Sequence, residues 1–240
     1  DLTEVNLAAA DQATDTPTNN FCTMNPLDNY YQGSTFSEGN CKVATGGSGI
    51  YTFNTGTIGL TAGKWYWEFK TSSVAAAIAG ITPTLSTSAT NEIVQVVDSI
   101  SMELGSASVK KTAATQYTET GEGFDTDDIG HIALDMDNLK FYIGKGDSWF
   151  NSGDPTSGAT GTGAVAVTAP GSVTVGTGEY FPAQSDPGHA VNTMEWSFGG
   201  CPAFALSSAA ADANGYGAFE YAPPSGYLAI CTKNLGSDGG

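Results

Sequence analysis

The stretch GKWYWEFK (residues 63–70) decides the fold class of this chain. Successive side chains of a β-strand point to opposite faces of the sheet. Trp65, Trp67 and Phe69 therefore share one face, while Glu68 and the lysines take the other. Large aromatic side chains gathered on one face predict a strand that packs this face against a hydrophobic core.

The same alternation recurs in LKFYI (139–143) and in TMEWSF (193–198). The first of these follows HIAL (131–134), and only DMDN (135–138) separates the two runs. Two apolar runs joined by a short polar segment predict a β-hairpin, because Asx side chains cap the backbone groups of tight turns.

The rest of the 240-residue chain continues this organisation, with short apolar runs separated by Gly, Ser, Thr, Asn and Asp. No segment keeps a 3.6-residue apolar period over the roughly 10–12 residues of a helix. The sequence therefore predicts an all-β protein, an antiparallel β-sandwich with long loops. Further strands are expected at 50–53, 74–81, 93–97, 100–104, 164–168, 172–175 and 227–231.

Four segments in this order resemble the SPRY domain family. They are GKWYWEFK (63–70), IGHIALDMDNLKFYIGKG (129–146), YFPAQSD (180–186) and MEWSFGG (194–200), and YLAICTKNL (227–235) extends the match. The resemblance implies a concanavalin A-like (jelly-roll) sandwich that binds a partner through loops at one edge and performs no catalysis. The hairpin ends in Gly-Lys-Gly where the family usually has an Asn-Gly or basic turn.

The flanking segments resemble SPRY modules within structural proteins of tailed bacteriophages. They are NNFCTMNPLDN (19–29), STFSEGNCKV (34–43), NSGDPTSGATGTG (151–163) and ADANGYGAFEYAPPSGYLAICTKNL (211–235). This resemblance implies a virion location in a tail fibre, a tail-associated protein or the capsid surface. The implied partners are other virion proteins and a host surface glycan or protein, and a homo-oligomer is expected because virion proteins are commonly symmetric.

Composition divides the chain into an N-terminal arm or linker (1–20), one sandwich (21–235) and a flexible C-terminal exit (236–240). One short helix is expected around 7–12, a long surface loop at 151–163, and an insertion with one helical turn at 207–217. The longest apolar stretch has about eight residues, whereas a membrane-spanning helix needs about 20. Membrane insertion is therefore not expected.

The charge balance is strongly acidic. Asp and Glu outnumber the basic residues 25 to 8, all eight basic residues are lysines, and the formal net charge is −17. A polyanion is repelled by such a surface, and the chain has no arginine for bidentate recognition of phosphate or guanine. Nucleic acid and anionic membranes are therefore disfavoured as partners.

Aromatic residues in predicted loops are the candidates for ligand contact, because sugar rings stack on exposed aromatic faces. They are Tyr30, Tyr31, Tyr117, Trp149, Phe150 and Tyr216. Trp149, Phe150 and Asn151 form the preferred patch, with the Asn151 amide available for hydroxyl groups. The alternative is that one of these aromatic side chains covers the edge of the sandwich.

Asp125, Asp127 and Asp128 form an acidic cluster just before the predicted hairpin. Ca²⁺ prefers oxygen ligands of this kind, so the cluster is a candidate calcium site. The spacing lacks the Gly and Glu of an EF-hand loop, and the alternative is a solvated acidic turn. No other cofactor is expected.

The four cysteines, Cys22, Cys41, Cys201 and Cys231, are too far apart in sequence for a CxxC motif. Two states remain open. They are either buried free thiols or disulfides, of which Cys22–Cys41 and Cys201–Cys231 are the simplest pairing, and disulfides would suit a particle outside a cell.

Catalytic patterns are sparse. Only His131 and His189 could serve a nucleophile triad, and no GxSxG motif accompanies them. A glycosidase needs paired carboxylates, but Asp135 and Asp137 lie in the predicted hairpin turn. We therefore expect a non-enzymatic attachment module, with a free-standing carbohydrate-binding module and a glycan-degrading hydrolase as alternatives.

Overall fold

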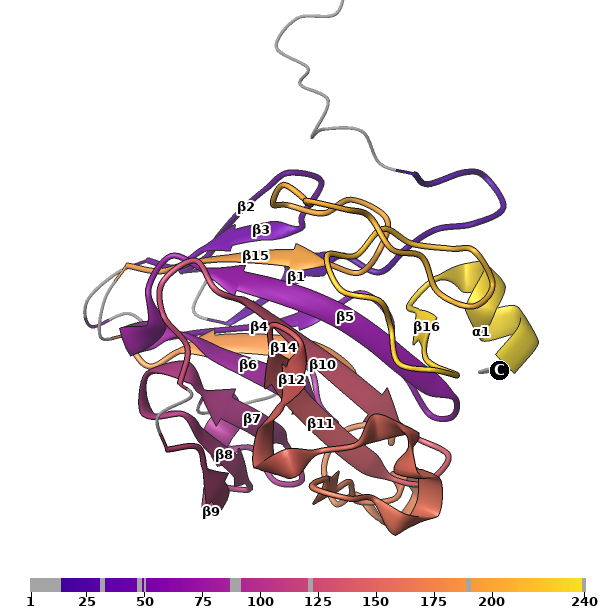
Figure 1. Cartoon of the computed structure of the whole chain (residues 1–240). Helices are drawn as coiled ribbons and strands as arrows, with labels where there is room; N and C mark the ends of the chain where they lie inside the picture. Colours follow the sequence, from indigo (N-terminus) through magenta and orange to yellow (C-terminus); the bar gives the residue numbers. More distant parts are fainter. Residues whose placement is uncertain are drawn as a thin grey trace, which may run out of the picture.

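The computed structural model describes residues 14–30, 33–46, 49, 51–86, 92–120, 123–188 and 191–238. Two facing sheets form a β-sandwich (Figure 1), as the sequence predicts. The first sheet has the order β1 (Met24–Tyr30), β4 (Thr52–Gly56), β14 (Phe181–Asp186), β6 (Ile78–Thr82), β7 (Ile100–Glu103), β8 (Ser108–Lys111) and β9 (Ala114–Thr118).

The second sheet has nine strands and is built around the stretch that decides the fold class. Its order is β12 (Ser148–Trp149), β11 (Lys140–Lys145), β10 (Ile129–Asp135), β5 (Lys64–Thr71), β15 (Thr193–Ser197), β3 (Lys42–Ala44) and β2 (Thr35–Ser37). β13 (Val165–Ala166) also pairs with β11, and β16 (Leu228–Ala229) runs parallel to the start of β5. All other strand pairs among the described residues are antiparallel.

The core lies between the sheets and contains the aromatic face of β5. Trp65, Trp67 and Phe69 are fully buried there, and Trp196 of β15 packs beside Phe69. The Trp196 indole N–H crosses the core and donates a 2.6 Å hydrogen bond to the buried Gln184 Oε1 of β14. This bond joins the two sheets and satisfies a polar group that would be costly to bury alone.

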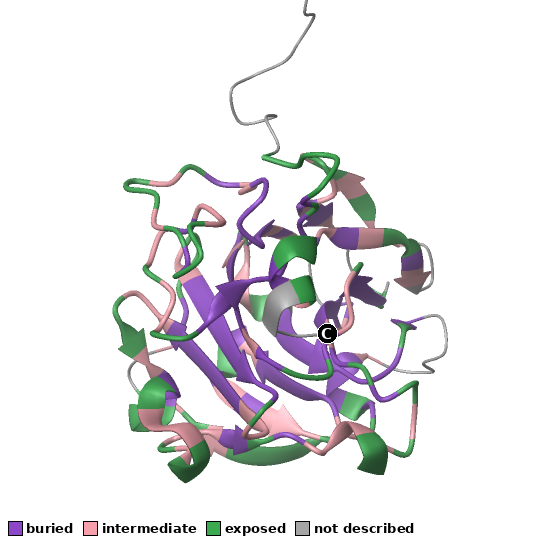
Figure 2. Cartoon of the chain, turned by 90° about the vertical axis from the view of Figure 1, so that its right-hand side faces the viewer, coloured by how far each residue is buried: buried purple, intermediate pink, exposed green. Residues whose placement is uncertain are grey.

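The outer face of the second sheet is buried as well, beneath a covering segment formed by residues 199–231. Phe219 of this segment packs edge-on against Tyr66 of β5, with ring centroids 5.1 Å apart, and Tyr227 and Ala229 belong to the same apolar cluster. Glu68 is consequently fully buried. Most strand residues in Figure 2 are buried, including both faces of the central strands.

The outer face of the first sheet is covered by a shorter segment. Ile93, Val94 and Val96 pack on Phe53 and Ile78. The sequence predicts a strand at 93–97, but this segment begins with a 3-10 turn, η4 (Ile93–Gln95). It lies over the sheet with its apolar side chains pointing inward, so a run of apolar residues does not imply strand pairing here.

The β10–β11 hairpin forms as predicted, with Asp135 and Asp137 in structural roles. Asp135 accepts hydrogen bonds from the backbone and side chain of Asn138 and pairs with Lys64 at 3.2 Å. Asp137 accepts a 2.8 Å bond from the Gly63 N–H at the start of β5. These contacts confirm that both carboxylates cap turn backbone.

The chain ends differ from the sequence-based boundaries. Residues 14–20 already contact the sandwich, through bonds such as Thr14 N–H to Gly200 O at 2.9 Å, and the expected helix at 7–12 lies outside the described residues. The C-terminal strand is only Leu228–Ala229, and it is followed by a helix, α1 (Thr232–Asp238), where 236–240 were expected to be a flexible exit. The Leu235 N–H donates to Cys231 O. Hydrogen bonds within the helix thus replace strand pairing in this part of the chain.

Three other predictions were wrong in detail. Segment 172–175 overlaps the 3-10 turn η8 (Pro170–Ser172) instead of forming a strand, and 207–217 contains no helical turn. Loop 151–163 folds into two short 3-10 segments, η6 (Phe150–Ser152) and η7 (Pro155–Thr160). No helix of the described residues is long and apolar enough to span a bilayer.

Asp212 fixes the covering segment in place. One of its carboxylate oxygens accepts from the N–H groups of Asn214 and Tyr216, and the other accepts from Ala229 N–H and Asn234 Nδ2, all within 2.7–2.9 Å. The carboxylate is buried, and so are its bonds to Ala229 N–H and Asn234 Nδ2, for which solvent cannot replace it.

We expect Asp212→Ala to lower the free energy of unfolding by about 3 kcal/mol, because it leaves buried donors without an acceptor. Urea denaturation monitored by tryptophan fluorescence measures this. Asp147→Ala, at an exposed aspartate, is the matched control and should stay within about 0.5 kcal/mol of the parent chain. Equal losses in the two variants would contradict the role given to Asp212.

Candidate functional site

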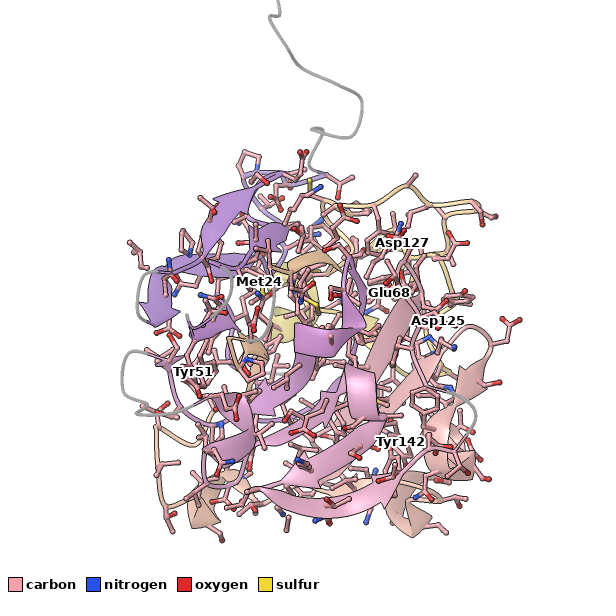
Figure 3. All side chains as sticks on the ribbon, turned by 90° about the vertical axis from the view of Figure 1, so that its left-hand side faces the viewer. Met24, Tyr51, Glu68, Asp125, Asp127 and Tyr142 are labelled. Carbon is pink, nitrogen blue, oxygen red and sulfur yellow. The ribbon has the colours of Figure 1, made fainter. Side chains whose placement is uncertain are left out.

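Four connections between strands meet at one end of the sandwich, on the left in Figure 1. Their described residues are 45–46, 49, 51, 72–77, 104–107, 187–188 and 191–192. Backbone hydrogen bonds hold them together: Thr45 N–H to Asn192 O at 2.8 Å, Gly49 N–H to Gly188 O at 2.7 Å, Ser72 N–H to Thr193 O at 2.9 Å, and Leu104 N–H to Ala77 O at 3.0 Å. Tyr51, nearly half exposed, stands at this end (Figure 3).

Three of these connections, 72–77, 104–107 and the one that begins at Pro187, line a cavity of about 390 Å³, which we call the loop-end cavity. Its lining comes from the β5–β6 connection, the start of β6, the β7–β8 turn, Glu92 before η4, and Pro187 after β14. The lining residues are Val74, Ala75, Ala77, Ile78, Glu92, Glu103, Gly105, Ser106 and Pro187.

Two short turns form the walls of this cavity. They are η2 (Val74–Ala76) and η5 (Leu104–Ser106), and the second ends at Ala107 in the left-handed conformation (φ 51°). A Cβ on Gly105 would lie only 2.9 Å from Val74 O. Glycine at position 105 therefore lets the two turns approach each other closely.

The loop-end cavity combines apolar walls with carboxylates. Val74, Ala75 and Pro187 supply apolar surface, and Glu92 and Glu103 are the charged groups of the lining. Glu103 pairs with Lys110 at 2.6 Å, across the β7–β8 hairpin. An apolar site with acidic groups is chemically suited to a basic side chain that has an apolar stem or neighbour.

The preferred aromatic patch at 149–151 is divided between core and surface. Phe150, which was expected to contact a ligand, is buried and packs edge-on against Phe124. Trp149 is half-buried and covers the imidazole of His131, with ring centroids 4.3 Å apart. Asn151 is exposed, but its amide nitrogen donates to Gly163 O and its backbone N–H to Glu119. The patch mainly closes an edge of the sandwich, the alternative left open by the sequence.

The other predicted contact residues do not join this patch. Tyr117 of β9 is half-buried and packs against the core. Tyr216 lies elsewhere, beside the Lys233 ammonium at 5.4 Å from its ring centroid. It lines a cavity of about 270 Å³ together with Thr14, Thr16, Asn19, Phe21, Gly215, Gly217 and Lys233. The Tyr30 side chain and Tyr31 lie outside the described residues.

The structure does not bring Asp125, Asp127 and Asp128, the candidate calcium ligands, together as a metal-binding group. Asp128 pairs with Lys145 at 2.9 Å and caps the Asp125 N–H, and Asp127 pairs with Lys70 at 3.4 Å. Figure 3 labels Asp125 and Asp127 in this turn. The carboxylates face lysines and backbone instead of one another, and the described part of the chain has no group of three His, Cys, Asp or Glu side chains able to hold a metal.

All four cysteines are buried free thiols, the first of the two states left open by the sequence. Neither predicted disulfide, Cys22–Cys41 or Cys201–Cys231, is formed. Cys201 belongs to the core between the sheets, whereas Cys231 packs with Tyr66 and Phe219 in the outer cluster.

Glu68 and His131 are directly opposite each other on β5 and β10, and sequence patterning did not identify them as a buried titratable pair. Burial raises the pKa of Glu68 from 4.5 to about 7, opposed by hydrogen bonds from the Tyr221 and Glu220 N–H groups and from Tyr66. Burial lowers the pKa of His131 from 6.5 to about 4, opposed by its bond to Ser148 O. The position of Glu68 on the outer face of β5 suggested that its side chain is exposed to solvent. The covering segment buries it instead.

Comparison with known proteins supports the fold and goes no further. No known family profile and no curated protein matches the chain. The SPRY domain of human HERC1 matches with a TM-score of 0.53 and 15% identity, covering 75% of this chain and 97% of that domain. A second human SPRY domain matches with a TM-score of 0.48 and 10% identity, covering 68% of this chain and 94% of that domain. The PSpry domain of TRIM65 matches with a TM-score of 0.48 and 12% identity, covering 74% of this chain and 92% of that domain. The chain thus has a SPRY-like, concanavalin A-like sandwich fold, as predicted.

The raised pKa of Glu68 predicts how stability depends on pH. Between pH 4.5 and about 7 the folded chain retains a proton that the unfolded chain has lost, so stability falls as pH rises through this window. In Glu68→Gln this contribution is absent. From pH 4.5 to 7.5 we therefore expect the free energy of unfolding of the parent chain to fall by about 3 kcal/mol relative to that of the variant. Parallel pH profiles from urea titrations would contradict this.

The lowered pKa of His131 predicts the opposite slope. Between pH 6.5 and about 4 the unfolded chain binds a proton that the folded chain excludes, so stability falls as pH drops through this window. His131→Gln should therefore become more stable relative to the parent chain on acidification from pH 7 to 4. Thermal unfolding at half-unit pH steps measures this, and a constant difference would contradict it.

Proposed function

We propose that this chain is a non-catalytic binding module of a tailed-phage virion, which attaches through the loop-end cavity to a protein partner. The partner is a neighbouring virion subunit or a host surface protein. The observation that carries the proposal is the cavity itself, which is lined by three of these connections and by Glu92 on a rigid two-sheet scaffold. Connections at one end of a sandwich are the usual place for recognition, because the scaffold holds them in position at the surface.

Charge indicates the chemistry of the partner segment. Five of the eight lysines already pair with carboxylates, so the net charge of −17 is carried by acidic groups that lack a lysine partner. A basic segment is attracted to such a surface over distances of about 10 Å. The apolar walls of the loop-end cavity add the requirement for an apolar side chain next to the basic one.

Two observations support the non-catalytic part of the proposal. His131 is buried beneath Trp149 with a lowered pKa, and Asp135 and Asp137 cap the hairpin turn. These three groups, which the sequence offered for acid–base chemistry, thus have structural roles. A glycan hydrolase would need two carboxylates that flank a sugar-sized cleft.

Glycan binding is a second candidate function, favoured by the cavity beside Tyr216. Its ring is accompanied by the hydroxyl groups of Thr14 and Thr16 and by the Asn19 amide. An aromatic face next to hydroxyl and amide groups is suited to a sugar ring. In a glycan array, binding that Tyr216→Ala abolishes would support this candidate.

We expect selection on immobilised full-length chain from a library of displayed random heptapeptides to enrich Lys or Arg next to apolar residues. Ala75→Trp should lower the affinity of the enriched peptides at least tenfold, because the indole fills the mouth of the loop-end cavity. Ala114→Trp is the matched control, since Ala114 is also exposed but lies on β9. Surface plasmon resonance with the enriched peptides measures both affinities.

Glu103→Gln tests the role of charge in the same assay. It should lower the affinity of basic peptides about tenfold and make this affinity less dependent on salt concentration. Glu179→Gln, at an exposed glutamate outside the cavity, should have neither effect. No enrichment above an unrelated acidic sandwich protein, or equal effects of Ala75→Trp and Ala114→Trp, would overturn the proposed site.

A further inference from the structure

Two of the four thiols are direct neighbours. Cys41 precedes β3, and Cys201 follows β15 at the start of the covering segment. Their side chains are within hydrogen-bonding reach of each other. The surrounding backbone is tied together as well, by Trp196 N–H to Cys41 O at 2.7 Å and Ala203 N–H to Trp196 O at 3.1 Å.

The other two cysteines are engaged elsewhere. The Cys22 thiol donates to Thr23 O at 3.5 Å and accepts from Thr57 Oγ1 at 3.8 Å, so it is directed toward the connection after β4. Cys231 lies on the other side of the second sheet, in the cluster of Tyr66 and Phe219. Cys22 is near enough to Cys41 to contribute to the raised pKa of Cys41, but Cys201 is the cysteine that lies within hydrogen-bonding reach of it among the described residues. The pairing that joins Cys41 to Cys201 therefore follows this direct contact.

We propose that Cys41 and Cys201 form a disulfide when the chain folds in oxidising surroundings. This bond ties the β2–β3 edge of the second sheet to the covering segment. Cys22 and Cys231 stay as thiols. The proposal is independent of the function proposed above.

Glutathione disulfide is a sufficient oxidant. The thiolate of one cysteine attacks a sulfur of glutathione disulfide, which forms a mixed disulfide and releases one glutathione. The thiolate of the second cysteine then attacks the protein sulfur of the mixed disulfide, which forms the Cys41–Cys201 bond and releases the second glutathione. Two electrons pass from the protein thiols to the oxidant, and their two protons end on the two glutathione molecules.

Burial determines when this reaction occurs. Cys41 and Cys201 have 1% and 6% of their surface exposed, and the contact with Cys201 together with burial holds the pKa of Cys41 well above its ordinary range. The thiolate is the attacking species, so the folded thiols react slowly. The bond should form during folding or local opening, and a chain folded under reducing conditions should stay reduced for longer.

The test is to refold the full 240-residue chain from urea in a glutathione redox buffer, block free thiols with iodoacetamide, and map the peptides by mass spectrometry. Trypsin is unsuitable, because no lysine separates Cys22 from Cys41 or Cys201 from Cys231. Cleavage after glutamate separates all four, because Glu38 and Glu220 lie between the members of these pairs. The expected product links peptide 39–68 to peptide 196–220, with Cys22 and Cys231 alkylated.

Paired variants give a second readout. Cys22→Ala/Cys231→Ala should still lose two hydrogen atoms on oxidation and show a Tm roughly 5–10 °C higher in its oxidised than in its reduced form. Cys41→Ala/Cys201→Ala should show no redox-dependent Tm. Peptide links 5–38 to 39–68 or 196–220 to 221–240, or alkylation of all four cysteines after oxidative refolding, would overturn the proposal.

Discussion

The burial of β5 on both faces is the constraint on which the rest of the structure depends. On its inner face, the indoles of Trp65 and Trp67 fill the space between the sheets. On its outer face, the Glu68 carboxylate accepts the backbone N–H groups of Glu220 and Tyr221, both at 2.8 Å, and the Tyr66 hydroxyl at 2.9 Å. These bonds attach the covering segment to the central strand, so the protein has a third layer on this side.

This third layer is stabilised by polar groups as much as by apolar contact. Glu68 of β5 accepts hydrogen bonds from its backbone, and Asp212 accepts hydrogen bonds from other residues of the same segment. A buried carboxylate without a cationic partner is costly unless its oxygens are hydrogen-bonded. The arrangement fixes residues 199–231 in one conformation, because a shifted segment would leave Glu68 unsatisfied.

A rigid sandwich positions the end connections for recognition. The connections are joined by backbone hydrogen bonds, and some of their side chains also support the fold, such as the buried Thr45, whose hydroxyl donates to Asp186 at 2.6 Å. The acidic, partly apolar loop-end cavity lies at this end. The edge at Trp149 has the opposite character, since its aromatic rings close the sandwich over His131 and Phe124.

The all-β class, the β10–β11 hairpin and the inward face of β5 could be predicted from the sequence, because these depend on local alternation and turn chemistry. Asp135 and Asp137 were assigned correctly for the same reason. The candidate site was much less predictable. Phe150 was expected in a loop and lies in the core, and the cavity lining comes from segments up to about 110 positions apart in the chain.

Which outward-facing strand residues are exposed to solvent depends on the packing of distant segments and could not be predicted from the sequence. Alternation distinguishes the two faces of a strand, but it cannot show whether a distant segment covers the second face. Residues 93–97 cover the outer face of the first sheet, and residues 199–231 cover that of the second. The second cover, together with Trp149, turns Glu68 and His131 into buried groups with displaced pKa values. The same limit applies to the cysteines. Sequence spacing favoured neighbours in the chain, whereas the fold places Cys41 beside Cys201, because proximity in a sandwich is set by strand pairing and not by separation along the chain.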